Sequence, residues 1–439
     1  MIRFGNENRN TFWVWLSLAC GVASREFGRL ASRYEPYELF SMNEEEIERI
    51  DGIGERLKRR LCNKNIEEAE KILAICEENG IDLISYADPR YPSRLRNIED
   101  PPAVLYVLGE LPSIENRPAI GVVGTRKMSE YGKTTAFDLS YELALAGVVI
   151  VSGLALGVDA VAACGALAAK GKTVAVLGCG VLVDYPKAHR TLKRAILRHG
   201  ALVSEYPPYE PAVPRNFPTR NRIISGMCQG TLLVEGALGS GSMITARLAI
   251  AQGRQLFTVP GKVGEKGSEG PNALIREGAY VVLDSQDILK HFEFLYREVL
   301  DFDALKQRRE RPDCDAALSY FGVPADYEIG RLGGRKPPMT REPIATAEPS
   351  PQLAPKPKSP SKPKKAAPPP ERDAKTPSPS VPLTAAEQAV LDRMPMDRPI
   401  SPDALCADGI EIGEVLTVLT MLEIYGVVTS LPGGLYLRK

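Results

Sequence analysis

Between residues 118 and 291, short apolar runs alternate with stretches whose apolar residues recur at helical spacing. The strand-like runs are residues 119–123, 148–152, 173–177, 201–204, 231–234 and 255–259. The helical patterns between them are residues 130–146, 159–170, 188–199, 223–227 and 242–252. This alternation predicts an α/β fold, in which helices cover both faces of a parallel sheet. Ligands of such sheets gather at the carboxyl ends of the strands.

The residues before this region predict a helical unit and a connector. Helical patterning extends to about residue 80, and Ile50-Asp-Gly-Ile-Gly54 has the pattern of a helix-hairpin-helix turn. Two interpretations stay open: the glycines admit a phosphate to backbone N–H groups, or they only turn the chain. The acidic run at residues 44–51 favours the second interpretation. The connector, residues 82–116, contains one expected strand at 104–108.

Beyond residue 295 the composition changes twice. Residues 331–382 hold 15 prolines and 11 Lys or Arg against four Asp or Glu. This composition predicts a disordered linker. Its basic charge could hold DNA loosely, but a solvated spacer is the favoured interpretation. Residues 383–439 predict helices at 386–394, 403–408 and 412–425 and a hairpin at 427–437, the order of a winged-helix domain. The expected domains are therefore residues 1–80, 81–295 and 383–439, with 296–382 as linker.

The charge of the winged-helix region argues against contact with duplex DNA. The region of its third expected helix carries Glu411, Glu414 and Glu423 and no Lys or Arg. Phosphate neutralisation dominates affinity for DNA, so an acidic recognition helix is a poor reader of the major groove. An interaction with a protein or with a second copy of the chain is the favoured interpretation.

Composition removes several classes of function. The 439 residues carry 55 basic and 55 acidic side chains, so any basic site must be local. The eight cysteines include no Cys-x-x-Cys pair and the three histidines lie far apart, which speaks against a metal site and against Ser/His or Cys/His catalysis. No signal-peptide core and no run of about 18 apolar residues is present, so a cytoplasmic location is expected. We expect no cofactor.

Glycine follows nearly every expected strand, at the edge where ligands bind. The strand-end motifs are Gly124-Thr125-Arg126, Ser152-Gly153, Gly178-Cys-Gly180, Gly239-Ser240-Gly241-Ser242 and Pro260-Gly-Lys262. Glycine lets a ligand approach the backbone, and a Gly/Ser loop that leads into a helix offers its N–H groups to an anion. The dinucleotide fingerprint GxGxxG is not matched, because Val183 stands where the third glycine belongs. An NAD enzyme is therefore not expected.

A basic and aromatic segment precedes the fifth strand. It reads Phe217-Pro-Thr-Arg220-Asn221-Arg222-Ile-Ile-Ser-Gly226. Guanidinium groups hold phosphates bidentately, and the ring of Phe217 is suited to stack on a base. Asn221 is expected to orient the loop or to cap the helix that follows. Phosphate and base are thus the expected ligands.

In chain order, motifs at residues 121–126, 151–155, 157–160, 185–186, 204–207, 217–226, 240–242 and 260–261 resemble those of the bacterial DNA-processing protein A family, also called DprA or Smf. The resemblance covers about residues 86–284, with Leu156 and Ala163 where relatives have arginine and histidine. It implies an extended Rossmann domain that binds and protects single-stranded DNA. It also implies assistance in loading RecA recombinase during natural transformation, and a homodimer through the Rossmann domain.

The resulting hypothesis is a non-enzymatic single-stranded DNA binder. The expected DNA contacts are Gly124, Thr125, Arg126, Ser152, Gly153, Arg215, Phe217, Arg220, Asn221, Arg222, Ser240, Gly241, Ser242 and Lys262. The alternative is a nucleotide-binding hydrolase that uses the same rim, with Glu235 or Asp159 as acid or base. Because no acid pair and no nucleophile–base pair is apparent, binding is favoured. Asp159 is instead expected at a helix start, and Glu235 is expected to fix a loop by accepting backbone N–H bonds.

Overall fold

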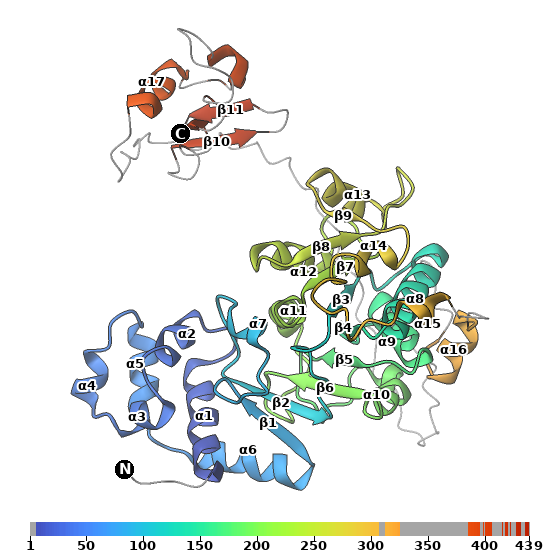
Figure 1. Ribbon diagram of the computed structural model, residues 1–439. Coiled ribbons are helices and arrows are strands. Elements are labelled where there is room, and N and C mark those ends of the chain that lie inside the picture. The colour runs from blue at the N-terminus through green and yellow to red at the C-terminus, as the bar shows by residue number, and fades with distance from the viewer. Residues whose placement is uncertain are drawn as a thin grey trace, which may run out of the picture. The chain divides into compact units, whose positions relative to one another are not determined.

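The structure is a computed structural model that describes residues 6–306 and 312–324 and, in the C-terminal part, 385–395, 398, 400–405, 415, 418–419, 422, 427–431 and 435–438. The chain divides into two compact units, residues 1–338 and 339–439. Figure 1 shows the described helices and strands of both units. Within these described ranges, no helix combines the length and the apolar character that crossing a bilayer requires.

The first unit begins with a cluster of six helices. They are α1 (Asn6–Cys20), α2 (Arg25–Ala31), α3 (Pro36–Ser41), α4 (Glu44–Glu48), α5 (Glu55–Cys62) and α6 (Glu67–Glu78). α4 starts in a capping box, because Asn43 Oδ1 accepts the Glu46 N–H at 3.0 Å and the Glu46 carboxylate accepts the Asn43 N–H at 2.8 Å. α5 buries Leu57 and Leu61, which lie one turn apart on one face. The expected N-terminal helices are confirmed.

A nine-stranded sheet forms the centre of this unit, counted over the described residues. Its strands are β1 (Ile81–Ser85), β2 (Val104–Gly109), β3 (Ala119–Val123), β4 (Val149–Ser152), β5 (Thr173–Val176), β6 (Gly200–Ser204), β7 (Gly230–Leu233), β8 (Gln255–Thr258) and β9 (Tyr280–Val281). Their order is β1-β2-β6-β5-β4-β3-β7-β8-β9. The pairs from β6 to β9 are parallel, whereas β1–β2 and β2–β6 are antiparallel.

Helices cover both faces of this sheet. They are α7 (Ser93–Arg96), α8 (Glu130–Leu145), α9 (Val158–Ala168), a 3-10 turn η1 (Lys187–His189), α10 (Arg190–Ile196), α11 (Asn216–Met227), α12 (Gly241–Ala251), α13 (Glu269–Arg276), α14 (Gln286–Leu289), α15 (Phe302–Lys306) and α16 (Cys314–Tyr320). α8, α9 and α10 pack on one face, and α11 and α12 pack on the other (Figure 1).

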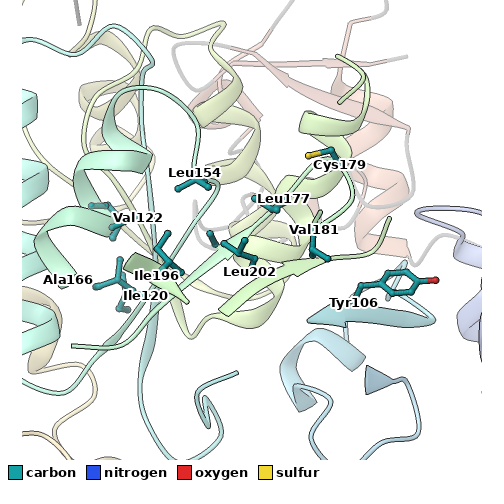
Figure 2. Close-up of a cluster of buried hydrophobic side chains, with 14 of the residues drawn as sticks. Tyr106, Ile120, Val122, Leu154, Ala166, Leu177, Cys179, Val181, Ile196 and Leu202 are labelled. Carbon is teal, nitrogen blue, oxygen red and sulfur yellow. The ribbon is translucent and has the colours of Figure 1, made fainter. Parts of the chain in front are cut away.

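The alternation of side chains along β3 shows how one strand serves both layers. Ile120 and Val122 join the cluster on the α9 side, next to Ala166 and Ile196, as Figure 2 shows. Ala119 and Val123 point to the opposite face and pack in the cluster that contains α11. This period of two is the geometry of an extended strand with both faces buried. The parallel α/β fold that the hydrophobic pattern predicts is therefore confirmed.

The six expected core strands match the structure to within one residue at each end. Two edge strands, β1 and β9, were not predicted, because β9 has only two residues and β1 lies between the end of α6 and a turn-rich loop. The larger difference is α11. The hydrophobic pattern placed the start of this helix at residue 223, but it begins at Asn216, so the whole basic and aromatic segment is helical.

The second unit is described in part. Its elements are α17 (Ala385–Arg393), a 3-10 turn η2 (Pro402–Leu405) and the antiparallel pair β10 (Val428–Leu431) and β11 (Leu435–Arg438). Val415, Leu419 and Leu422 are helical and pack with Val390 and Leu391 in one buried cluster. The first helix and the hairpin are confirmed. Of the expected second helix at 403–408, residues 403–405 lie in the 3-10 turn η2, and residues 406–408 lie outside the described residues. Residues 331–382 and the glutamates 411, 414 and 423 lie outside the described residues.

A candidate nucleic-acid groove at the carboxyl edge of the sheet

A groove of about 460 Å³ opens at the carboxyl edge of the sheet, between the ends of β3 and β7. The chain runs outward from β3 through β4, β5 and β6, then crosses back to β7 on the other side of β3. This reversal creates a crevice at the point where the strand order switches, which is where open α/β sheets bind their ligands. Most wall residues come from the loop after β3, from α11 and from the start of α12, and Ala155, Asp159 and Tyr185 follow the ends of β4 and β5.

Neighbouring backbone fixes the loop after β3. The N–H of Thr125 donates to the carbonyl of Glu235 at 2.8 Å, and the Thr125 carbonyl accepts from the N–H of Val158 at 3.2 Å. Gly157 has a φ of 84°, and a Cβ at that position would lie 2.3 Å from the Thr125 oxygen. Only glycine permits this approach. Arg126 is thereby carried on a clamped loop, although its own side chain is exposed.

Glu235 closes the N-terminus of α8. Its carboxylate accepts the Ser129 N–H at 2.9 Å and the Ser129 hydroxyl, and Ser129 Oγ in turn accepts the Gly132 N–H at 3.0 Å. A Cβ on Gly132 would lie 2.2 Å from the Glu235 carboxylate, so the glycine makes room for this contact. The expectation that Glu235 accepts backbone N–H bonds is confirmed. Glu235 is 5% exposed and does not line the groove.

The N-terminus of α12 is open to the groove. Ser240 is the N-cap, and its carbonyl accepts the Met243 N–H at 3.1 Å, but its hydroxyl accepts no N–H from the helix and lies 2.8 Å from the hydroxyl of Ser242. Gly241 has nothing within 4 Å of its Cβ position. Asn221 of α11 donates to the Gly241 carbonyl at 3.3 Å and so orients this loop, as expected. The first N–H groups of a helix have no partner within the helix, so this turn presents donors and a positive dipole end to an anion.

Two aromatic rings and one arginine face each other across the groove. The Arg126 guanidinium lies 5.8 Å from the centre of the Phe217 ring, within cation–π range. The Tyr185 and Phe217 rings are 5.3 Å apart and tilted by 40°. Gly178 lies directly behind Phe217, where a Cβ would come within 2.9 Å of the ring. Tyr185 was not predicted as a site residue, although the Tyr-Pro motif marked its position.

Arg220 forms the inner wall of the groove. It is 3% exposed. Its Nη1 donates to the Gly153 carbonyl at 2.8 Å and to the Val176 carbonyl, and its Nε donates to Asn221 Oδ1 at 3.3 Å. The guanidinium therefore ties α11 to the ends of β4 and β5. Its Nη2 has no hydrogen-bond partner among the described residues.

Asp159 is the carboxylate closest to this arginine. It stands in the first turn of α9, as expected, and accepts the Ala155 N–H at 3.3 Å. Burial raises the pKa of Asp159, and the nearby Arg220 guanidinium opposes that rise. Burial likewise lowers the pKa of Arg220, and Asp159 opposes that change. The charge of Arg220 is thus partly balanced before any ligand binds.

The structure corrects the prediction for Arg222. Its Nη2 donates to both oxygens of Glu205 at 2.8 and 2.7 Å, and its Nε lies 3.2 Å from Asp100 Oδ2. The side chain is 4% exposed and lies outside the groove. The reason is helical geometry: Arg220 and Arg222 stand two residues apart in α11, which places them about 200° apart around its axis. Only Arg220 faces the groove.

Ser152 also departs from its expected role. Its hydroxyl donates to the Val122 carbonyl at 2.7 Å, and the residue is 2% exposed, so the hydroxyl ties β4 to β3.

Gly153 lines a small adjoining cavity of about 60 Å³. Arg215 and Lys262 are exposed outside the groove lining, and Lys262 lies 3.5 Å from Glu265. The remaining expected residues that line the groove are Gly124, Thr125, Arg126, Phe217, Arg220, Asn221, Ser240, Gly241 and Ser242.

His189 contacts the loop after β4 at the same edge of the sheet. This role was not predicted from the sequence. Its Nδ1 lies 3.0 Å from the carbonyl of Leu154, at the end of β4. Leu154 has a φ of 54°, a left-handed conformation that a leucine rarely adopts. His189 is fully buried, and burial lowers its pKa. A neutral imidazole therefore holds a strained peptide that borders the small cavity.

Acidic side chains are scarce in the described lining of the groove. Asp159 is its one carboxylate among the described lining residues, and both Asp159 and Glu235 already accept backbone N–H bonds. Over the described part of the chain, no group of three His, Cys, Asp or Glu side chains is placed to hold a metal ion. What the groove presents instead is the guanidinium of Arg126, the rings of Tyr185 and Phe217 and the first turn of α12.

The helix-hairpin-helix turn holds an internal carboxylate. The Gly54 N–H, at the start of α5, donates to Glu26 Oε1 at 2.5 Å. The Gly52 carbonyl accepts from Arg29 Nη1 at 2.8 Å, and Gly52 has a φ of 84°. Glu26 thus stands where a phosphate was considered. This arrangement favours the interpretation in which the two glycines turn the chain.

These features define an α/β protein of Rossmann type with a groove at its topological switch point. Residues 82–293 match the family described as DNA recombination-mediator protein A, and residues 363–434 match the DprA winged helix domain. The chain belongs to this DprA/Smf family of DNA-processing proteins, as the motifs indicated.

Two relatives and one solved structure illustrate the match. The chain is 40% identical over 220 residues to the DNA processing protein DprA of Bacillus subtilis. The aligned region covers 50% of this chain and 74% of the relative. It is 41% identical over 244 residues to protein Smf of Escherichia coli, which covers 55% of this chain and 65% of that protein. The X-ray structure of DprA from Streptococcus pneumoniae has a TM-score of 0.50 and 31% identity, and covers 65% of this chain and 94% of that chain.

Proposed function

We propose that this protein binds single-stranded DNA along the groove between β3 and β7 and acts as a mediator of recombination without chemistry of its own. The observation that carries the proposal is the placement of Arg126 over the Phe217 ring, next to the open N-terminus of α12. A cation, a partly exposed aromatic ring and backbone donors are the components of a single-strand site. Membership of a DNA-processing family supports it.

The phosphates are proposed to follow the cationic and donor groups of the rim. Arg126 has no ion-pair partner among the described residues, so its charge is available to a phosphate. The Gly241 and Ser242 N–H groups supply donors at the helix start. Arg220 offers its Nη2 from the groove wall, and Arg215 extends the basic rim. Lys262 would join them after leaving Glu265, at little cost because the pair is exposed.

The base is proposed to stack on Phe217 and Tyr185. Both rings line the groove, and Tyr185 is 39% exposed. Stacking on a side chain needs a base whose face is not covered by its neighbours in a duplex, which selects single strands. Because every base has such a face, the proposal predicts binding with little sequence preference.

We propose that a second copy of the chain binds at the edge of the sheet that ends in β9. β9 is an edge strand, and exposed apolar side chains follow it in the chain, including Leu283 at 78% and Phe294 at 94% exposure. Clusters of this kind mark interaction surfaces. Light scattering should show a dimer for the wild type and a monomer for the double variant Leu283→Glu, Phe294→Glu. A wild-type monomer at micromolar concentration would overturn this part of the proposal.

Loading of RecA recombinase, a place in natural transformation and a cytoplasmic location complete the proposal. They rest on membership of a recombination-mediator family and on the sequence. The proposed domains are residues 1–80, 81–295 and 383–439. A pull-down of RecA by the full chain, with and without single-stranded DNA, tests the partner. Absence of RecA from both samples would remove it.

A mobility-shift titration tests the binding itself. A labelled single-stranded oligonucleotide and its duplex are titrated with the full chain at two salt concentrations. We expect at least tenfold tighter binding of the single strand and a loss of affinity at the higher salt. Equal affinity for both DNA forms, or turnover of DNA or nucleotide with Mg²⁺, would contradict the proposal.

A further inference from the structure

The edge of the sheet farthest from β9 carries an unpaired strand. β1 is the outermost strand and pairs only with β2, as Figure 1 shows in blue at the end of the sheet near α1 and α6. The register of the pair places Ile81 opposite Leu108, Leu83 opposite Tyr106 and Ser85 opposite Val104. An edge strand of this kind presents a row of backbone donors and acceptors to any extended chain that can reach it.

The pattern of hydrogen bonds shows which residues face the open edge. The Tyr86 N–H donates to the Ala103 carbonyl at 2.9 Å, so those two residues form a hydrogen-bonded pair. In an antiparallel ladder such pairs alternate with non-bonded pairs. Ile81, Leu83 and Ser85 therefore direct their N–H and C=O groups away from β2. The Ser85 carbonyl already accepts the Asp88 N–H at 2.9 Å, which leaves the groups of Ile81 and Leu83 for another strand.

A groove of about 920 Å³ runs beside this edge. β1, α1, α6 and the loop after β1 form its walls, with Ile81, Leu83 and Ser85 among the lining residues. The volume is twice that of the groove between β3 and β7. There is thus room beside the free N–H and C=O groups for a further extended segment of chain.

The groove is acidic. It is lined by five carboxylates and two guanidinium groups, namely those of Glu35, Glu70, Glu77, Asp82, Asp88, Arg9 and Arg90. Arg90 forms ion pairs with both Asp82 and Asp88. The other three carboxylates have no ion-pair partner among the described residues. A phosphate backbone would be repelled here, whereas lysine or arginine side chains would be attracted.

We propose that this groove is a docking site for an extended, lysine- or arginine-rich segment of a partner protein, which adds as a strand to β1. Backbone pairing with Ile81 and Leu83 supplies the affinity, and the carboxylates of Glu70 and Glu77 on α6 select basic side chains. β1 is separated from β3 by four strands, roughly 24 Å at the usual strand spacing. The site is therefore independent of the proposed DNA groove.

The probe is a labelled peptide of alternating lysine and valine, acetylated and amidated, with a glutamate–valine peptide as its counterpart. Fluorescence anisotropy with the full chain should show the basic peptide binding at least tenfold tighter than the acidic one. The double variant Glu70→Lys, Glu77→Lys should bind the basic peptide about tenfold more weakly. The matched control is Glu67→Lys, Glu68→Lys, the same change in charge on exposed positions of α6 outside this groove, which should bind like the wild type.

Amide hydrogen exchange separates strand addition from charge attraction. In the presence of the basic peptide, the N–H groups of Ile81 and Leu83 should exchange at least tenfold more slowly. Unchanged exchange at both positions would overturn strand addition. Equal binding of the acidic peptide, or equal weakening by the two double variants, would overturn the site. Affinity for single-stranded DNA should be unchanged in Glu70→Lys, Glu77→Lys, so a failure here is distinct from a failure of the DNA proposal.

Discussion

The guanidinium of Arg126 lies 5.8 Å from the centre of the Phe217 ring and so joins the loop after β3 to the first turn of α11. The two residues are 91 positions apart in the sequence, and the switch in strand order brings them to one edge. A phosphate on the guanidinium would place its neighbouring base at the ring.

Arg126→Ala should weaken binding of single-stranded DNA to a similar extent for all sequences. Loss of one phosphate contact should reduce the slope of log affinity against log salt by about 0.7. The control is Arg198→Ala, an exposed arginine just before β6, at the opposite edge of the sheet. Binding isotherms at four salt concentrations measure both slopes. If the Arg126 slope equals that of the wild type in a folded protein, the arginine does not contact phosphate.

Phe217→Leu should lose roughly 1–3 kcal/mol of binding free energy, because leucine fills space but offers no aromatic face. The half-buried ring also packs against Gly178, so thermal unfolding is measured alongside the isotherm. Phe217→Tyr keeps the aromatic face and should retain affinity within a few-fold. Equal affinity of the leucine variant and the wild type would place the ring in the core and away from DNA.

Arg220→Ala should chiefly destabilise the fold. It removes hydrogen bonds to the Gly153 and Val176 carbonyls and leaves Asp159 buried without its nearest cation, a loss of roughly 3–5 kcal/mol by comparison with other buried pairs. The double variant Arg220→Ala, Asp159→Asn should recover part of this free energy of unfolding. Denaturant titrations measure both. A stable single variant with a reduced salt slope would show that the arginine serves DNA alone.

His189 should make the stability fall in mild acid. Burial holds its folded pKa below the usual value of about 6.5, so the unfolded chain takes up a proton more readily than the folded one. The contribution of the neutral His189 side chain to the free energy of unfolding is complete at pH values above the pKa of the unfolded chain. It is lost as the pH falls below it, by about 1.4 kcal/mol for each pH unit in which only the unfolded state is protonated.

His189→Asn tests the pH dependence, because an asparagine amide can still donate to the Leu154 carbonyl but does not titrate. Unfolding curves at pH 7 and pH 5 should differ less for this variant than for the wild type. His199→Asn is the control and should behave as the wild type. An identical pH dependence of all three proteins would show that His189 has an ordinary pKa in the folded state.

The hydrophobic pattern was sufficient for the core of the fold because buried parallel strands are continuous apolar runs. β3, for example, was located at both of its ends. The start of α11 was missed because Phe217-Pro218 interrupts the apolar pattern, although proline is well accommodated in the first turn of a helix. The short edge strand β1 alternates less clearly and follows α6 directly.

The sequence was sufficient to predict which types of residue lie at the candidate site, but not which of their side chains face the groove. Gly124 and Arg126 line the groove because they directly follow the end of β3, and the sequence located that strand end. Whether Arg220 or Arg222 reaches the groove depends on the helical phase of α11, which required the true start of that helix. The partners of Arg222, Asp100 and Glu205, come from distant parts of the chain and carry no local signal.

The most direct test of the central claim is a photochemical crosslink. A single-stranded oligonucleotide that contains 5-iodouracil is bound to the full chain and irradiated, and the crosslinked peptides are identified by mass spectrometry. The groove between β3 and β7 predicts crosslinks at Phe217 or Tyr185, with a large loss of yield in Arg126→Ala at concentrations below saturation. Crosslinks confined to the helix-hairpin-helix turn at residues 50–54 or to residues 383–439 would contradict it.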